Sequence, residues 1–89
     1  MVGIELKLTG DLKTQNLIPW ICHRASLLDL KGWVKRHSGS SVEIAVFGPE
    51  PLLDAMEVAC FLGPCDAFVT SLQKRELTIG AIPNDFLTT

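Results

Sequence analysis

Residues 2–10 of the chain, VGIELKLTG, decide the fold. The apolar side chains of Val2, Ile4, Leu6 and Leu8 alternate with residues that are small, polar or charged. Because successive side chains of a strand point to opposite faces of a sheet, this alternation predicts a β-strand with one buried face. Such a face needs other elements of the chain to cover it.

A helical segment follows this strand. Residues 19–29, PWICHRASLLD, bring Ile21, Ala25 and Leu28 to one side of a helix. The proline that opens the segment fits a first helical turn, where its missing N–H has no partner to lose. Asn16, just upstream, belongs to the residue types that cap helices. We therefore expect a helix that packs its apolar side on the first strand.

The remaining elements complete a regular order. A second helix is expected over residues 51–62, PLLDAMEVACFL, since Gly63 and Pro64 then stop it. Two strands flank the turn SGSS and form a hairpin, a fourth strand follows the second helix, and turn chemistry at Pro83-Asn84-Asp85 precedes a short closing strand. These strands are expected at residues 31–37, 42–48, 66–77 and 86–88.

The resulting β-α-β-β-α-β order predicts an α+β fold. We expect a two-layer α/β sandwich of ferredoxin-like type, with a mostly antiparallel sheet in strand order 4-1-3-2 and both helices on one face. The expected core collects the apolar positions of every element, which are Ile4, Leu6, Leu8, Ile21, Ala25, Leu28, Val34, Ile44, Val46, Leu53, Met56, Cys60 and Val69.

Length and composition predict a single globular domain over residues 1–89. The chain is 47% hydrophobic, so it can bury a core, and its net charge of −2 gives no bulk attraction to nucleic acid or to an acidic membrane surface. The apolar runs are too short for a membrane span, and the start lacks the pattern of a signal peptide. These features predict a cytoplasmic protein without membrane association.

The three cysteines are Cys22, Cys60 and Cys65. An odd count without a C-x-x-C pair argues against a disulfide framework or a zinc site, and no ligand cluster predicts another metal or a cofactor. Free thiols are the default in a reducing cytosol. A disulfide between Cys60 and Cys65 is disfavoured, although their short separation leaves it open.

Five short motifs in register point to a family. They are Gly32-Trp33-Val34, Val42-Glu43, Gly48, Gly63-Pro64 and the later Ala67 and Val69. In this order they resemble the acylphosphatase family, which carries G-W-V-x-N, D-G-x-V-E and G-P-x-x-A-x-V. The resemblance covers roughly residues 4 to 88 and implies the same ferredoxin-like fold.

The resemblance also implies a site. The family's loop G-x-V-Q-G-V-x-F-R wraps a phosphate with backbone N–H groups and clamps it with the arginine, while the asparagine of G-W-V-x-N orients the attacking water. In this sequence Ile18 stands at the arginine position and Arg36 at the asparagine position. Thr14 occupies the place of the loop glycine, and Asn16, which tolerates positive φ, that of a common second glycine.

Two residues that should act on substrate are thus replaced. The first hypothesis is a catalytically inactive domain that serves as a small binding or interaction module or persists as a diverged paralogue. Weak binding of phosphate or sulfate at the loop and the start of the helix is still expected. The residues for it are Lys13, Thr14, Gln15, Asn16, Leu17 and Arg36. For Lys13 and Arg36 an ordinary solvent-exposed role is the stronger expectation. The protein partner is not specified by the sequence.

Two other hypotheses stay open. In the first, the chain is an active acylphosphatase with unusual ligands. In the second, it is an unrelated module that binds an effector or self-associates through its sheet edge. Binding of RNA on the sheet is not expected. Lys31 and Lys35 flank Trp33 on one face, but no second sheet aromatic is expected beside it, as a stacking platform needs.

Overall fold

The computed structural model describes residues 3–64, 66–77 and 86–88. Cys65 and the expected turn at residues 83–85 lie outside these ranges. The described elements are β1 (Gly3–Asp11), α1 (Leu17–Leu27), β2 (Lys31–Ser38), β3 (Ser41–Phe47), α2 (Glu50–Leu62), β4 (Phe68–Leu77) and β5 (Phe86–Thr88).

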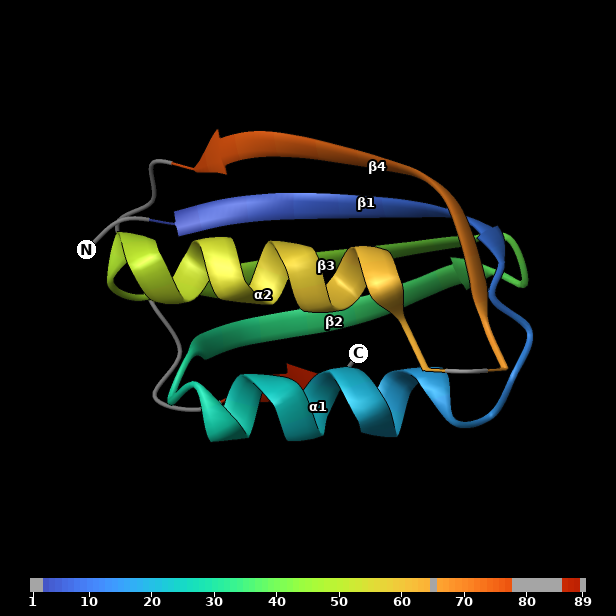
Figure 1. Ribbon diagram of the computed structural model, residues 1–89, viewed down its shortest axis with the longest axis horizontal. Coiled ribbons are helices and arrows are strands. Elements are labelled where there is room, and N and C mark those ends of the chain that lie inside the picture. Colours follow the sequence, from blue (N-terminus) through green and yellow to red (C-terminus); the bar gives the residue numbers. More distant parts are fainter. Residues whose placement is uncertain (1–2, 65, 78–85, 89) are drawn as a thin grey trace.

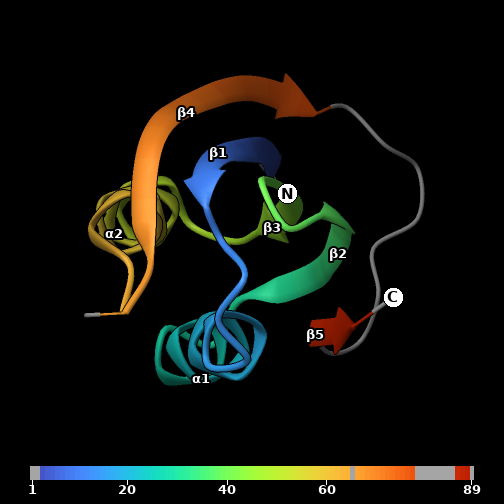
Figure 2. The same cartoon turned by 90° about the vertical axis from the view of Figure 1, so that its right-hand side faces the viewer.

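The strands form one sheet in the order β4-β1-β3-β2-β5. Neighbouring strands are antiparallel except β5, which runs parallel to β2. Both helices lie on the same side of this twisted sheet (Figures 1 and 2). The two-layer α+β sandwich with strand order 4-1-3-2 is therefore confirmed, and the short closing strand extends the sheet beyond β2.

The core lies between the helices and the inner face of the sheet. Of the expected core positions, Leu28 and Val69 are half-buried against it, and the others are buried. Leu12 and Leu17, at the two ends of the β1–α1 connection, are also completely buried. Burying an aliphatic side chain contributes about 1.5 to 3 kcal/mol, so these two leucines tie the connection to the core at both ends.

The first helix begins earlier than expected. It starts at Leu17 instead of Pro19, which becomes its third residue, and it ends at Leu27. Asn16 is the N-cap residue as expected, but its side chain makes no capping hydrogen bond. The helix start is thus held by the burial of Leu17, and the Asn16 side chain is free to bond elsewhere.

Two glycines are required by close contacts between strands. At Gly32 the φ angle is +144°, and an added Cβ atom would lie 1.8 Å from the carbonyl oxygen of Ala45. At Gly10 the φ angle is +152°, and the corresponding atom would lie 2.0 Å from the carbonyl oxygen of Phe68. No L side chain fits either position without moving backbone, which explains the glycine at the start of the Gly-Trp-Val motif.

The outer face of the sheet carries a pair of aromatic rings. The Trp33 ring lies against Phe47, with 5.7 Å between ring centroids. The expectation that no aromatic residue stands beside Trp33 was wrong, because Lys31 pairs with Phe47 and so brings its ring to the same face. Phe47 is only 1% exposed, so the pair does not offer two open ring faces for stacking.

Candidate functional site

The loop of interest joins β1 to α1 at one end of the sheet. Figure 1 shows it close to the β2–β3 turn and to the connection between α2 and β4. Backbone hydrogen bonds fix it to the turn, since the Gly10 N–H donates to the Ser40 carbonyl at 3.1 Å and the Leu12 N–H to the Gly39 carbonyl at 2.9 Å. The loop is therefore anchored before it reaches the helix.

Arg36 reaches this loop from β2. Its guanidinium donates hydrogen bonds to the carbonyl oxygens of Leu12 at 2.5 Å, Thr14 at 3.4 Å and Ser38 at 3.4 Å. A guanidinium has five N–H donors. Three hydrogen bonds of Arg36 thus go to backbone carbonyls. Arg36 is half-buried and bonded to the loop, so the expectation that it is an ordinary solvent-exposed strand residue was wrong.

These contacts fix the direction of two peptide groups. The peptide bonds of the described chain are all trans, and a trans peptide directs the C=O of one residue and the N–H of the next to opposite sides. Because the carbonyls of Leu12 and Thr14 face Arg36, the N–H groups of Lys13 and Gln15 point away from it. The loop thus presents acceptors to the Arg36 side chain.

A carboxylate contacts the same loop from another element. Asp66, in the connection between α2 and β4, accepts hydrogen bonds from the Thr14 hydroxyl at 2.6 Å and the Asn16 amide at 2.7 Å. These two hydrogen bonds lower the pKa of Asp66. The side chains at the family's glycine positions therefore bind a negative charge of the protein itself, beside the N-terminus of α1.

The conformation of the loop does not use glycine-like angles. Asn16 has φ −83° and ψ −16°, and Asp29 alone has positive φ among the non-glycine residues that the structure describes. The suggestion that Asn16 replaces a glycine at positive φ was therefore wrong. The loop follows a path that ordinary residues adopt, so Thr14 and Asn16 cost no backbone strain.

A shallow hollow of about 420 Å³ lies beside the loop and is lined by Lys13, Thr14, Gln15, Ile18, Arg36 and Gly39. Four of the six expected anion-binding residues meet there. Leu17 is buried in the core, and Asn16 is bonded to Asp66. Ile18 gives the hollow an apolar wall where the family resemblance implies a cation. The site thus holds two cations, Lys13 and Arg36, of which the second is engaged with carbonyls.

Sequence reasoning missed Asp66. The residue follows the Gly63-Pro64 motif by two positions, where the family pattern leaves the residue type open. Nothing in the local sequence indicates that its carboxylate lies against a loop 50 residues earlier, because that contact depends on how the α2–β4 connection crosses the end of the sheet. The signal available in the sequence was that Thr14 and Asn16 put polar side chains at the family's glycine positions, where they need a hydrogen-bond partner.

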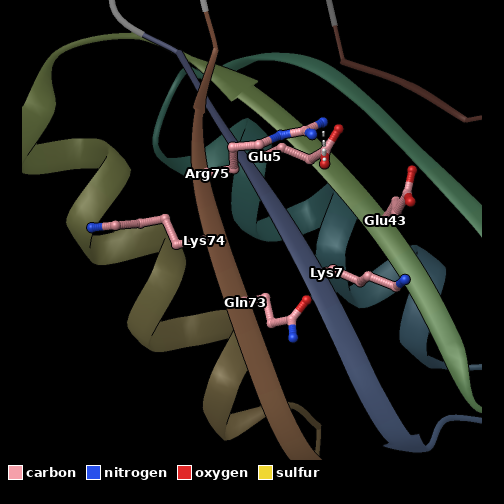
Figure 3. A pocket seen from close by; sticks show the side chains of 6 residues that line it. All are labelled: Glu5, Lys7, Glu43, Gln73, Lys74 and Arg75. Carbon is pink, nitrogen blue, oxygen red and sulfur yellow. Dashed lines mark hydrogen bonds and ion pairs between the residues drawn. The ribbon is translucent and has the colours of Figure 1, made fainter.

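A larger hollow, about 730 Å³, lies on the open face of the sheet. Figure 3 shows Arg75 reaching across to Glu5, with which it pairs at 2.8 Å, whereas Lys74 points to the other side, toward α2. Lys7, Glu43 and Gln73 complete the wall with both charge signs. Mixed charges on an open surface do not converge on one ligand, so this hollow is a weaker candidate than the loop.

The described residues outside these two hollows offer no stronger site. They contain no cluster of three or more potential metal ligands, and none of their helices is long and apolar enough to cross a membrane. Cys22 and Cys60 are free thiols, and burial raises the pKa of Cys60 to about 12. Pairing of Cys60 with Cys65 involves a residue outside the described ranges.

Comparison with known proteins agrees with the motifs. The family model for acylphosphatase matches residues 4–86. An acylphosphatase of Rhodospirillum rubrum is 39% identical over 73 residues, which cover 82% of this chain and 80% of that protein. The crystal structure of acylphosphatase from Bacillus subtilis superposes with a TM-score of 0.92 at 24% identity, over 100% of this chain and 99% of that one. The fold also occurs within a larger protein, because HypF of T. kodakarensis matches with a TM-score of 0.87 at 21% identity over 100% of this chain but only 12% of its own. The match over nearly the whole chain shows that this protein belongs to the acylphosphatase family.

Proposed function

We propose that this chain is a catalytically inactive member of its family that acts as a small interaction module and needs neither a metal nor a cofactor. The observation that carries the proposal is the contact of Arg36 with the carbonyls of Leu12 and Thr14. A loop that binds a phosphoryl group must direct N–H donors toward it. Here the Leu12–Lys13 and Thr14–Gln15 peptide groups direct their carbonyl oxygens toward Arg36, so their N–H groups point away from it.

The missing side chains support the same conclusion. Hydrolysis of an acyl phosphate mainly needs positioning and stabilisation of charge, because the leaving group is already good. Ile18 offers no donor at the arginine position, and Arg36 has no acceptor with which to orient a water as an amide does. Loss of one well-placed donor costs on the order of 10² to 10³ in rate, so two losses are severe.

Weak anion binding remains part of the proposal. The N–H groups of Leu17 and Ile18 stand in the first turn of α1, where N–H groups have no partner within the helix. Lys13 adds a positive charge, but Asp66 already holds a negative one beside this helix start. We therefore expect phosphate or sulfate to bind with a dissociation constant of about 1 mM or weaker.

The alternative is an active acylphosphatase, and the names of the relatives favour it. In that case Arg36 would have to release the loop carbonyls and contact the phosphate itself, which a forked guanidinium is able to do. A cytoplasmic location is proposed for either function, supported by the free thiols of Cys22 and Cys60, which are the usual state in a reducing compartment.

A hydrolysis assay with benzoyl phosphate separates the two functions. We expect the wild-type protein to match buffer, and the double variant Ile18→Arg, Arg36→Asn to be faster than either single variant. The neighbouring Lys35→Asn serves as a control that changes charge on the same strand. Wild-type turnover of about 1 s⁻¹ or more, ordinary for an enzyme, together with its loss in Arg36→Ala would establish the alternative.

A phosphate titration tests the loop separately. The backbone amides of residues 13–18 are followed by NMR while inorganic phosphate is added to about 50 mM, well above the expected dissociation constant. Small shifts at Thr14, Leu17 and Ile18 that level off only at millimolar phosphate are expected, without a change at Lys13 and Gln15. Tight saturable binding that includes Lys13 and Gln15 would show that the two peptide groups turn and that the loop is a working site.

A further inference from the structure

Helix α2 has two apolar sides. Its inner side carries Leu53, Met56 and Cys60, which are buried in the core. A second set, Ala55, Val58 and Leu62, recurs at the same three- and four-residue spacing. With about 100° of rotation per residue this second set lies opposite the first, and it is named the outer stripe here.

The outer stripe faces solvent. Val58 is 60% exposed and Leu62 70% exposed, and the adjacent Phe61 is 54% exposed. A helix that is apolar on both sides is typical of one with a partner on each, and contiguous exposed apolar surface marks interaction sites. Within the described residues only the inner side of α2 has its partner.

The outer stripe forms a ridge between two grooves. One groove, about 410 Å³, lies between α1 and α2 and includes Trp20 and Arg24 in its wall. The other, about 420 Å³, lies between α2 and β4 and includes Asp54 and Leu72. Val58 lines both grooves and therefore stands on the ridge between them. A ridge flanked by grooves is a shape that fits a second copy of itself.

The two flanks of the ridge carry opposite charges. Arg24 lies on the α1 flank, with its guanidinium 5.2 Å from the centre of the Trp20 ring. Asp54 and Glu57 lie on the β4 flank, where Glu57 pairs with Lys74 at 3.1 Å. Neither Arg24 nor Asp54 forms an ion pair with another described residue. The α1 flank thus carries the cation Arg24, and the β4 flank carries two carboxylates that share the single cation Lys74.

We propose that the outer stripe of α2 binds a second copy of this chain, with a two-fold axis running parallel to α2. This axis packs the two stripes together side by side and brings Arg24 of each copy to the flank that carries the other copy's Asp54. An axis perpendicular to α2 would instead face each flank with its own like charges. The three- and four-residue spacing of Ala55, Val58 and Leu62 is also that of a helix-pair seam.

The proposal does not depend on whether the loop at the end of the sheet is active. Two turns of helix and their flanks make a small interface, so a dissociation constant between about 10 μM and 1 mM is expected. Charge pairing at the flanks selects the orientation more than it adds affinity.

Sedimentation velocity over about 10 μM to 1 mM protein covers this range of affinity. The weight-average mass of the wild-type chain should rise from the 9.7 kDa monomer toward twice that value. Val58→Glu places a charge in the stripe and should keep the mass at the monomer value. Phe68→Glu is the matched control, since Phe68 is an equally exposed apolar residue, 68%, at the start of β4. It should leave the rise unchanged.

A reciprocal charge exchange tests the orientation without changing the apolar contact. Arg24→Glu and Asp54→Arg should each weaken association by about 10-fold, and the double variant should restore it to within a few-fold of wild type. A monomer at every concentration, an equal loss in Phe68→Glu and Val58→Glu, or no restoration in the double variant would each overturn the proposal. Circular dichroism of every variant verifies that it is folded.

Discussion

At the scale of single residues, Arg36 and Asp66 hold one loop through opposite charges. Arg36 binds its carbonyls from β2, and Asp66 binds the side chains of Thr14 and Asn16 from the α2–β4 connection. The loop carbonyls bound by Arg36 and the loop side chains bound by Asp66 would otherwise bond to solvent or to a ligand. The loop is thereby supplied with internal partners of both signs.

Removal of the guanidinium should loosen the loop. Arg36→Ala leaves the Leu12 and Thr14 carbonyls without their donor, and hydrogen bonds to a charged group at a half-buried position contribute about 1 to 2 kcal/mol in total. Urea unfolding should show a loss of this size in the free energy of unfolding. Lys35→Ala, on the same strand but exposed, should change it by less than about 0.5 kcal/mol. Equal effects of the two substitutions would mean that the contacts of Arg36 carry no stability.

The effect of Asp66 should depend on pH. The pKa of Asp66 is lowered in the folded state by the hydrogen bonds from Thr14 and Asn16, so its contribution to stability is full above its ordinary value of 3.8 and is lost as pH falls through the folded pKa. The difference in unfolding free energy between wild type and Asp66→Asn should therefore shrink between about pH 5 and pH 2. Asp11→Asn, an exposed carboxylate at the end of β1, is the control. A difference that stays constant over this range would contradict the assignment.

At the scale of elements, three connections meet at one end of the sheet. The β1–α1 loop, the β2–β3 turn and the α2–β4 connection are joined there by hydrogen bonds that span up to 52 residues of sequence. Between strands, Gly10 lets β1 approach β4 closely, and Gly32 lets β2 approach β3 closely. These long-range constraints fix where the loop runs.

Gly32 tests the close approach of β2 to β3. Gly32→Ala would place a Cβ atom 1.8 Å from the Ala45 carbonyl oxygen at a positive φ, so the strands must separate, at a cost of about 3 kcal/mol or more. Gly39→Ala is the control. Its Cβ would meet only the flexible Lys13 side chain, at 2.8 Å, and should cost less than about 1 kcal/mol. Thermal unfolding of both variants measures the contrast, and similar melting temperatures would refute it.

The sequence predicted the elements better than their side-chain partners. Alternation and helical periodicity act locally, so β1, the hairpin, α2 and the strand order followed from them. The start of α1 was misplaced by two residues because the burial of Leu17, a tertiary effect, extends the helix ahead of Pro19. The roles of Arg36 and Asp66 and the pairing of Trp33 with Phe47 depend on register and on crossing connections, which no local pattern contains.

At the scale of the whole molecule, the described chain is organised around one apolar core without a buried charged residue. Cys60 belongs to this core and is completely buried, whereas Cys22 is half-buried at its edge. Burial raises the pKa of the Cys60 thiol to about 12, so that its reactive thiolate is scarce in the folded protein.

Cys60 should therefore report global unfolding. At pH 8, alkylation by iodoacetamide followed by peptide mass analysis should modify Cys22 more than about 100-fold faster than Cys60, since a core thiol reacts only through large-scale opening. Addition of urea below the unfolding midpoint should accelerate Cys60 in proportion to the unfolded population. Comparable rates in the absence of urea would show that α2 opens locally.

The central position of β1 has a consequence for biosynthesis. Its second neighbour, β4, pairs Gly3 with Leu77 and Asp11 with Phe68, so one side of β1 lacks its partner until β4 has also been synthesised. At about 5 to 20 residues per second, synthesis from Asp11 to Leu77 takes roughly 3 to 13 s. During that interval the apolar Ile4, Leu6 and Leu8 border an unpaired strand edge, where a nascent chain is open to chaperones and to association with other unfinished copies.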